Sequence, residues 1–235
     1  MDRERRLRVV TWNVHGLRSG IPAVARAMRS LEPDVALVQE SGPRMSLLRM
    51  GATLGMQVAN DPFSFPRRRV KNAVLVRYPW RLGPSRLHRF ARSARFYPRG
   101  VLVAEISDGR RRLLAASVHL GLRPAERRRH SAELERIVLD AAGGGSAVIA
   151  GDFNEFATGR AIGALSGRFA DAALDVAGVA GVAAPTFPSK EPVARIDYVF
   201  LTRDLEILSV RVPFEEDIAR ASDHLPVVVE ISLPR

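Results

Sequence analysis

The sequence predicts an α/β (α+β) protein in which short buried strands alternate with helices and form mixed sheets. Apolar runs of about four to eight residues, the length of a buried strand, recur along the whole chain. Most are separated by turn residues or by stretches whose apolar residues follow helical spacing. The 235 residues contain no short-period repeat and no flexible linker, so one domain spanning residues 1–235 is the simplest organisation.

The N-terminal part of the chain is expected to alternate between strands and helices. Gly20 and Pro22 open the first helix, and the Pro33 region ends it. The expected elements are a strand over 7–13, a helix with apolar residues from 21 to 31, a strand over 35–39, a helix over about 44–54, a loop rich in Pro and Arg, and a strand over 73–76.

The rest of the chain continues this alternation. Asp108 and Gly109 separate two apolar runs, which predicts a hairpin, and Pro124 begins a helix that the glycines at 143–145 end. The expected elements are strands over 101–106 and 113–118, a helix from 124, a strand before the stretch GDFNEF at 151–156, a helical stretch over about 158–174, and strands over 196–201, 205–212 and 226–231.

Composition excludes several classes of site. With no cysteine, the chain has neither disulfides nor thiolate ligands, so a metal must be held by oxygen or imidazole. No apolar run approaches the length that crosses a bilayer, and the N-terminus lacks a signal-like apolar region. A cytoplasmic monomer without membrane insertion is therefore expected.

The net charge of +11 suggests a polyanionic partner such as DNA or RNA. Nearly all of the positive charge is arginine, however, since Lys71 and Lys190 are the only lysines, and a GC-rich coding sequence gives the same skew. Runs such as Arg110–Arg112 and Arg127–Arg129 are more often solvated faces than binding patches. Charge alone leaves a nucleic-acid partner open.

Polar residues stand where the apolar strands end or begin. The start of one strand lies beside the end of its antiparallel neighbour, so these residues can meet along one rim of a mixed sheet. Each one alone has an ordinary explanation as a turn or cap residue, but six such positions together predict one site. Strands end at Asn13, Glu40, His119 and Asp152 with Asn154, and others begin near Asp197 and near Asp223 with His224.

This set of side chains suits the attack of water on phosphorus. Carboxylates are hard oxygen ligands for Mg²⁺ or Mn²⁺, which neutralise charge on phosphate oxygens. A histidine can exchange protons near neutral pH or stabilise the transition state when charged, and a neighbouring carboxylate positions it and raises its basicity.

Seven blocks of the sequence resemble those of the endonuclease/exonuclease/phosphatase superfamily, which includes DNase I, exonuclease III-type enzymes, sphingomyelinases and inositol-polyphosphate 5-phosphatases. They follow the family's order and span almost the whole chain. The resemblance implies a four-layer α/β/β/α sandwich of the DNase I type. The blocks are TWNVHG (11–16), LVQE (37–40), NAVLVRYP (72–79), SVHLGL (117–122), GDFNEF (151–156), RIDYVF (195–200) and SDHLPV (222–227).

The resemblance also implies residue roles. By position, Glu40 is the principal ligand for Mg²⁺ or Mn²⁺ with Asn13 beside it, and Asp223 supports the metal or its network. Asp152 and Asn154 orient the attacking water, and His119 contacts the phosphate. Asp197 orients His224, while the general base stays open between Asp152 and the Asp197–His224 pair. Asn72 and Arg99 are expected to bind phosphate or substrate, whereas His15, His88 and His130 match no family position and are expected to be structural or surface residues.

Two departures narrow the resemblance. SVHLGL carries a histidine where exonuclease III-type AP endonucleases carry Tyr with Asn or Gln, and Ser-Gly-Pro follows Glu40 without their usual lysine. The chain is therefore more similar to the DNase I, sphingomyelinase and phosphatase branches.

The expected activity is that of a metal-dependent, nuclease-like phosphodiesterase. Alternatives are a phosphatase or phosphodiesterase acting on a phospholipid or an inositol phosphate, or a catalytically silent binding module of the same fold. A basic groove formed by Arg67–Arg69, Lys71 and Arg99 favours nucleic acid, whereas an exposed apolar loop beside the site favours lipid.

Overall fold

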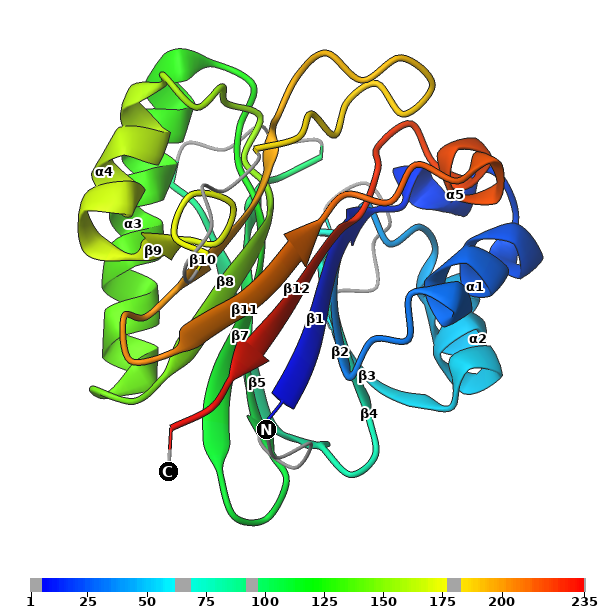
Figure 1. The fold of residues 1–235 in the computed structure, drawn as a ribbon, viewed down its shortest axis with the longest axis horizontal. Coiled ribbons are helices and arrows are strands. Elements are labelled where there is room, and N and C mark those ends of the chain that lie inside the picture. Colours follow the sequence, from blue (N-terminus) through cyan, green and yellow to red (C-terminus); the bar gives the residue numbers. More distant parts are fainter. Residues whose placement is uncertain (1–5, 62–68, 92–96, 177–182, 235) are drawn as a thin grey trace.

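Two β-sheets pack face to face and helices cover both outer faces, so the predicted four-layer α/β/β/α sandwich is confirmed (Figure 1). This is a computed structural model, which describes residues 6–61, 69–91, 97–176 and 183–234.

The first sheet is mixed, as expected. β1 runs parallel to β2 and antiparallel to β12, and the other neighbouring strands are antiparallel. Its order is β11 (Glu206–Arg211), β12 (Val227–Ser232), β1 (Arg6–Asn13), β2 (Val35–Gln39), β4 (Ala73–Arg77) and β3 (Met56–Asn60).

The second sheet is mixed as well, with β7 parallel to β8 and its other neighbouring strands antiparallel. β6 and β7 form the predicted hairpin, in which Oδ1 of Asp108 accepts the backbone N–H groups of Arg110 and Arg111. The order is β5 (Arg81–Arg89), β6 (Gly100–Ser107), β7 (Arg112–His119), β8 (Ala147–Asp152), β10 (Asp197–Leu201) and β9 (Ala170–Asp171).

Three apolar clusters hold the layers together. The largest lies between the sheets, and one further cluster lies beneath the helices of each outer face. None of the helices in the described ranges is long and apolar enough to cross a membrane. α1 (Ile21–Ser30), α2 (Arg44–Leu54) and α5 (Glu216–Ala221) cover the first sheet, and α3 (Pro124–Ala142) and α4 (Arg160–Arg168) cover the second (Figure 1).

Five elements were not predicted, namely β3, β5, α5, the short strand β9 and a 3-10 helix over His15–Leu17, and one helix was predicted too long. β5 is an edge strand with exposed arginines, so it lacks the apolar pattern by which strands are found. β3 occupies the start of the expected Pro- and Arg-rich loop, whose residues 62–68 lie outside the described ranges, and α5 is only six residues long. The helix expected over 158–174 ends at Arg168, because Ala170 and Asp171 pair with β10 instead.

Candidate active site

The strand register places three of the predicted site residues in one row across the second sheet. His119 at the end of β7 pairs with Asp152 at the end of β8, which pairs with Asp197 at the start of β10. Asn13 ends β1 in the facing sheet, and its side chain reaches Asp152. The predicted convergence of strand ends and starts is thus present at the upper rim in Figure 1.

Gly151 permits the close contact between β7 and β8 on which this row depends. A Cβ atom at this position would lie 1.9 Å from the carbonyl oxygen of Val118, far inside van der Waals contact. Only glycine therefore fits this backbone without displacing β7. The glycine of GDFNEF sets the position of Asp152.

Asp152 lies at the centre of the site and is buried. Its Oδ2 accepts a hydrogen bond of 3.1 Å from Nδ2 of Asn13, and it lies 3.2 Å from Nε2 of His119 and 3.8 Å from Nε2 of His224. Its Oδ1 accepts the backbone N–H of Asn154 at 2.9 Å. The carboxylate is thus fixed from both sides.

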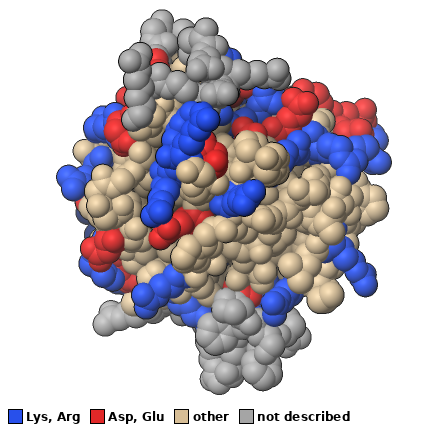
Figure 2. All heavy atoms as spheres, turned by 90° about the horizontal axis from the view of Figure 1, so that it is seen from below, with Lys and Arg blue, Asp and Glu red and all other residues tan. Residues whose placement is uncertain are grey.

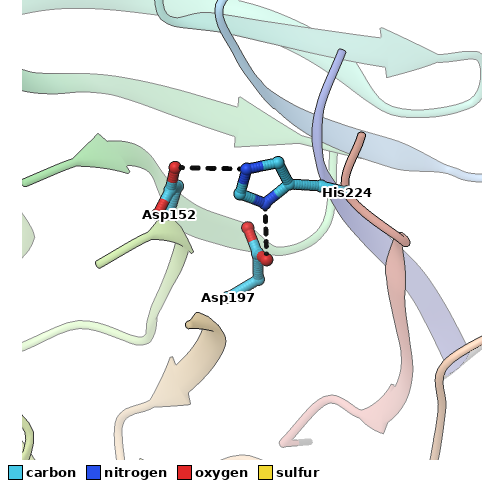
Figure 3. A group of neighbouring side chains, drawn as sticks. All are labelled: Asp152, Asp197 and His224. Carbon is cyan, nitrogen blue, oxygen red and sulfur yellow. Dashed lines mark hydrogen bonds and ion pairs between the residues drawn. The ribbon is translucent and has the colours of Figure 1, made fainter. Parts of the chain in front are cut away.

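His224 lies between two carboxylates, with its ring nitrogens facing Asp197 and Asp152 (Figure 3). Its Nδ1 is 2.9 Å from Oδ2 of Asp197, an oxygen that also accepts a 2.6 Å hydrogen bond from the Thr186 hydroxyl. The indole of Trp12 donates to the His224 carbonyl at 2.8 Å, so β1 anchors this segment. The structure thus brings Asp197 into direct contact with the imidazole that the resemblance implies it orients.

Arg99 determines which nitrogen of His119 carries the ring proton. Its guanidinium lies 2.9 Å from Nδ1 of His119, and because arginine only donates, Nδ1 must accept. The proton therefore resides on Nε2 and points at Asp152. The Nε2–H groups of His119 and His224 can thus both face the carboxylate of Asp152 at the rim.

The two histidines differ in charge because their surroundings differ. Burial, reinforced by the Arg99 charge, lowers the pKa of His119, so its ring is neutral near pH 7. Burial also opposes charge on His224, but Asp197 and Asp152 outweigh it and raise the pKa of His224 to about 9. Burial works against ionisation of Asp152 too, yet His119, His224 and Asn13 hold its pKa well below the usual value.

Two of the expected substrate-binding or water-orienting residues use their side-chain N–H groups within the protein. Nδ2 of Asn72 donates to the carbonyls of Gly100 and Ser117, and Nδ2 of Asn154 donates to that of Leu120. Oδ1 of Asn72 is buried and has no hydrogen-bond partner in the described ranges. Both side chains therefore hold the rim together through their amide N–H groups.

Several rim residues adopt a backbone conformation that is unfavourable for side chains. His15, Leu17, Glu40 and Asn154 have φ angles of 46°, 59°, 46° and 50°. A non-glycine residue held there costs of order 1–3 kcal/mol, and such strain clusters at functional sites. The chain thus tolerates strain where the polar groups converge.

Glu40 is suited to hold a hard cation. Its carboxylate makes no hydrogen bond or ion pair with any described residue, although it lines a cavity beside His119 and Arg99. The side-chain oxygen of Asn13 is less available to a cation, because Oδ1 already accepts the backbone N–H of His15 at 3.0 Å. Oxygen donors of this kind fit Mg²⁺ or Mn²⁺.

A second group of potential metal ligands overlaps the hydrogen-bonded chain. Asp152, Asp197 and His224 each bring one ligand atom within 4.8 Å of the others. A cation among them would have to replace the contact between His224 and Asp197. This group is better described as an acid–imidazole–acid chain, and Glu40 as the candidate metal ligand.

His15 lies at the site although no family position suggested it. Its Nδ1 is 3.5 Å from Oδ1 of Asp223, a half-exposed carboxylate, and His15 lines both the cavity beside Glu40 and a second cavity beside Asp223. The other two unassigned histidines fit their expected roles, since His130 is buried against Phe90 and His88 lies on edge strand β5. The sequence signal that could have identified His15 is its position two residues after Asn13.

Further supporting residues could not have been found from their own patterns. Gln39 of β2 donates to Oγ of Ser117 on β7 at 3.2 Å, which links the two sheets beneath the rim. Thr186, which donates to Asp197, belongs to a loop without a distinctive motif. These side chains act only through three-dimensional neighbours.

Comparison with known proteins agrees with this fold. The model of the Endonuclease/Exonuclease/phosphatase family matches residues 10–224. No curated protein sequence matches the chain significantly.

Solved structures show the same architecture. An endonuclease/exonuclease/phosphatase from Bacteroides vulgatus has a TM-score of 0.83 at 19% identity, covering 97% of this chain and 99% of its own. The mannosyl-6-phosphatase of Bacteroides thetaiotaomicron has a TM-score of 0.81 at 17% identity, with coverages of 97% and 100%. The human Nocturnin catalytic domain, solved with a bound sulfate anion, has a TM-score of 0.77 at 17% identity, with coverages of 100% and 97%. At these identities the likeness establishes the fold alone.

Proposed function

The chain belongs to the endonuclease/exonuclease/phosphatase family, and from this premise we propose that it hydrolyses phosphoester bonds with the help of a divalent cation. The observation that carries the proposal is the buried chain from Asp197 through His224, Asp152 and His119 to Arg99. It places a cationic imidazole, a neutral imidazole and a carboxylate at one rim.

Asp152 is the residue proposed to act on the attacking water. It is ionised at neutral pH and held by Asn13 and by the backbone of Asn154, so a water bound to it has a fixed orientation. As the new P–O bond forms, the bond between phosphorus and the leaving oxygen breaks, and the proton of the water passes to this carboxylate. Asn154 positions Asp152 through this backbone contact.

The two histidines are proposed to stabilise charge on the non-bridging oxygens. Asp197 keeps His224 protonated and oriented, and Arg99 keeps the Nε2 proton of His119 directed toward the rim. In the transition state these two donors, which face Asp152 in the free protein, would turn to the charge that develops on the phosphorus oxygens. A Mg²⁺ or Mn²⁺ ion held by Glu40 would neutralise charge on the leaving oxygen.

Two fold relatives are consistent with a phosphate-handling site. One bears the name mannosyl-6-phosphatase, and another holds sulfate, a tetrahedral oxyanion of phosphate-like shape. A phosphatase acting on monoesters is accordingly the second candidate beside a phosphodiesterase.

Hydrolysis of two chromogenic esters, with and without EDTA, tests the proposal. Bis-p-nitrophenyl phosphate reports diester cleavage and p-nitrophenyl phosphate reports monoester cleavage, each assayed with Mg²⁺ and with Mn²⁺. Asp152→Asn and His224→Gln should each lower kcat by about 10²- to 10⁴-fold, the usual contribution of a positioned proton-transfer or charge-stabilising group. EDTA should abolish turnover, and Glu40→Gln should raise the metal concentration needed for half-maximal rate.

Matched controls separate chemistry from folding. Asp140→Asn alters an exposed carboxylate on α3, and His88→Gln alters a histidine on edge strand β5. Both should retain wild-type rates. Absence of turnover of either ester by the metal-loaded wild type, or wild-type rates in Asp152→Asn, would show the hydrolase assignment to be wrong.

A further inference from the structure

A basic cavity of about 480 Å³ opens beside the site and shares Glu40, His119 and Arg99 with it. Among the described residues that line it, Glu40 is the one acidic side chain. The cationic side chains that line it are Arg18, Arg44, Arg69, Lys71 and Arg99. The cavity therefore offers a positively charged pocket next to the position proposed for the reacting phosphate.

Arg69 is a buried cation whose charge is only partly compensated. Its side chain is 3% exposed, and one guanidinium nitrogen reaches the Gly42 carbonyl at 3.5 Å, the limit of a hydrogen bond. Its Nε and Nη2 have no hydrogen-bond partner within the described ranges. Asp61 provides a counter-charge, yet burial outweighs it and lowers the pKa of Arg69, so an anionic group in the cavity would further stabilise the charged guanidinium.

The neighbouring Lys71 is held in place on the same wall. Its ammonium lies 5.5 Å from the centre of the Tyr97 ring, a cation–π distance, and its carbonyl accepts the Ser41 N–H at 2.9 Å. The backbone N–H of Val70, between Arg69 and Lys71, donates to Asp61 at 2.6 Å. The two cations are thus fixed relative to the loop that follows Glu40, which makes the pocket preorganised.

The dimensions favour a compact ligand. A volume of about 480 Å³ lies within the usual range of small-molecule pockets, about 300–1,000 Å³. Arg67 and Arg68 of the expected basic groove lie outside the described ranges, while Arg69, Lys71 and Arg99 line this cavity. The charge is therefore concentrated around a small volume.

We infer that this cavity is a subsite for a second phosphate group, so that the substrate is a compact molecule carrying at least two phosphates. One phosphate lies at Asp152, His119 and His224 for hydrolysis, and the other is held by Arg69 and Lys71. The inference rests on the proposed phosphoester hydrolysis and adds the substrate class to it. Lys71 and Arg69 are binding residues here, because they would contact the phosphate that is retained.

Kinetics with matched substrates test this inference. Fructose 1,6-bisphosphate, fructose 1-phosphate and fructose 6-phosphate are compared in wild type, Arg69→Gln, Lys71→Gln and the control Arg112→Gln. Arg112 lies at the opposite end of β7 from His119, so its variant removes one positive charge away from the site. Wild type and Arg112→Gln should prefer the bisphosphate in kcat/KM by about tenfold or more, as expected for charge-assisted hydrogen bonds to an added phosphate.

The subsite variants should lose that preference through KM while the monophosphate kcat stays within about twofold of wild type. Lys71→Gln is the second variant in case Arg69→Gln does not fold, which circular dichroism will show. A preference unchanged in Lys71→Gln, or an equal loss on mono- and bisphosphates, would overturn the inference. So would a single-stranded oligonucleotide that is cleaved faster than every bisphosphate and depends on Lys71.

Binding measured without turnover separates the two proposals. Titration of inorganic pyrophosphate into the protein in EDTA, followed by calorimetry, should show binding to wild type and Arg112→Gln that weakens about tenfold in Lys71→Gln. Pyrophosphate binding in a protein that hydrolyses no ester would support the subsite and contradict the hydrolase. Hydrolysis of chromogenic esters without Lys71-dependent pyrophosphate binding would support the hydrolase and overturn the subsite.

Discussion

His224 is the residue whose protonation state most affects the proposed reaction, because its ring lies between Asp197 and Asp152. The two carboxylates outweigh burial and raise its pKa to about 9, above the ordinary value near 6.5. The imidazolium is therefore the species present at neutral pH. As pH rises through about 9 the ring loses its proton and with it the charge proposed to stabilise the transition state.

The resulting pH dependence is testable. In wild type, kcat/KM for p-nitrophenyl phosphate with Mg²⁺ should fall as pH rises through about 9. Asp197→Asn removes the larger charge that favours the imidazolium, so the alkaline fall should move to lower pH. pH–rate profiles of the two proteins check this, with Asp140→Asn as the control. A profile of Asp197→Asn that falls at the same pH as wild type would show that another group is being titrated.

The raised pKa of His224 also makes the stability of the folded protein depend on pH. The folded-state pKa of His224 is raised, so its contribution to folding is complete below the unfolded value near 6.5 and is lost as pH rises through about 9. His224 thus links the site to the fold, because a charge that serves chemistry also stabilises the folded chain below that range.

At the scale of elements, β7, β8 and β10 act as one unit because their register aligns His119, Asp152 and Asp197. The sequence contains this information in part. Each strand is an apolar run with a polar residue at one end, which sequence reasoning detects, and parallel pairing of β7 with β8 brings the two ends together. The exact pairing depends on the close approach at Gly151.

Gly151→Ala tests that approach. The added methyl would overlap the Val118 carbonyl, so β8 must shift, and a misplaced Asp152 should lower kcat by at least about tenfold. Overpacking of this kind costs about 1–3 kcal/mol in unfolding free energy, measurable by urea denaturation. Gly167→Ala on α4 is the matched control, since its Cβ meets nothing within 4 Å and alanine favours a helix by up to about 1 kcal/mol. If both variants are as active and stable as wild type, the register does not depend on Gly151.

The elements and supporting residues that could not be predicted from the sequence share a physical cause. Strand β5 lacks an apolar face, and α5 is too short for a periodic signal. Thr186 and Gln39 matter only because folding brings them to Asp197 and Ser117. Local patterns reveal residues that carry their own chemistry, whereas supporting contacts between distant segments follow from the packed sheets.

At the scale of the whole molecule, the net charge of +11 raises the question of how an anionic partner would bind. Figure 2 views the end opposite the rim, where basic and acidic side chains are interspersed with neutral surface. The cavity beside Glu40 is different, because its basic side chains surround a confined volume and Arg69 is buried. Two modes of anion binding are thus possible, one diffuse and one local.

Salt distinguishes these modes. Binding of DNA to diffuse charge releases counterions and falls by several powers of ten between about 50 and 200 mM salt when many phosphates are contacted. Charges in a partly buried pocket are screened less, so kcat/KM for fructose 1,6-bisphosphate should fall by no more than about fivefold over that range. Fluorescence anisotropy of labelled duplex DNA and initial rates, both in KCl with fixed Mg²⁺, give the comparison. DNA that stays bound at 200 mM and is cleaved faster than the bisphosphate would indicate that the basic surface serves a nuclease.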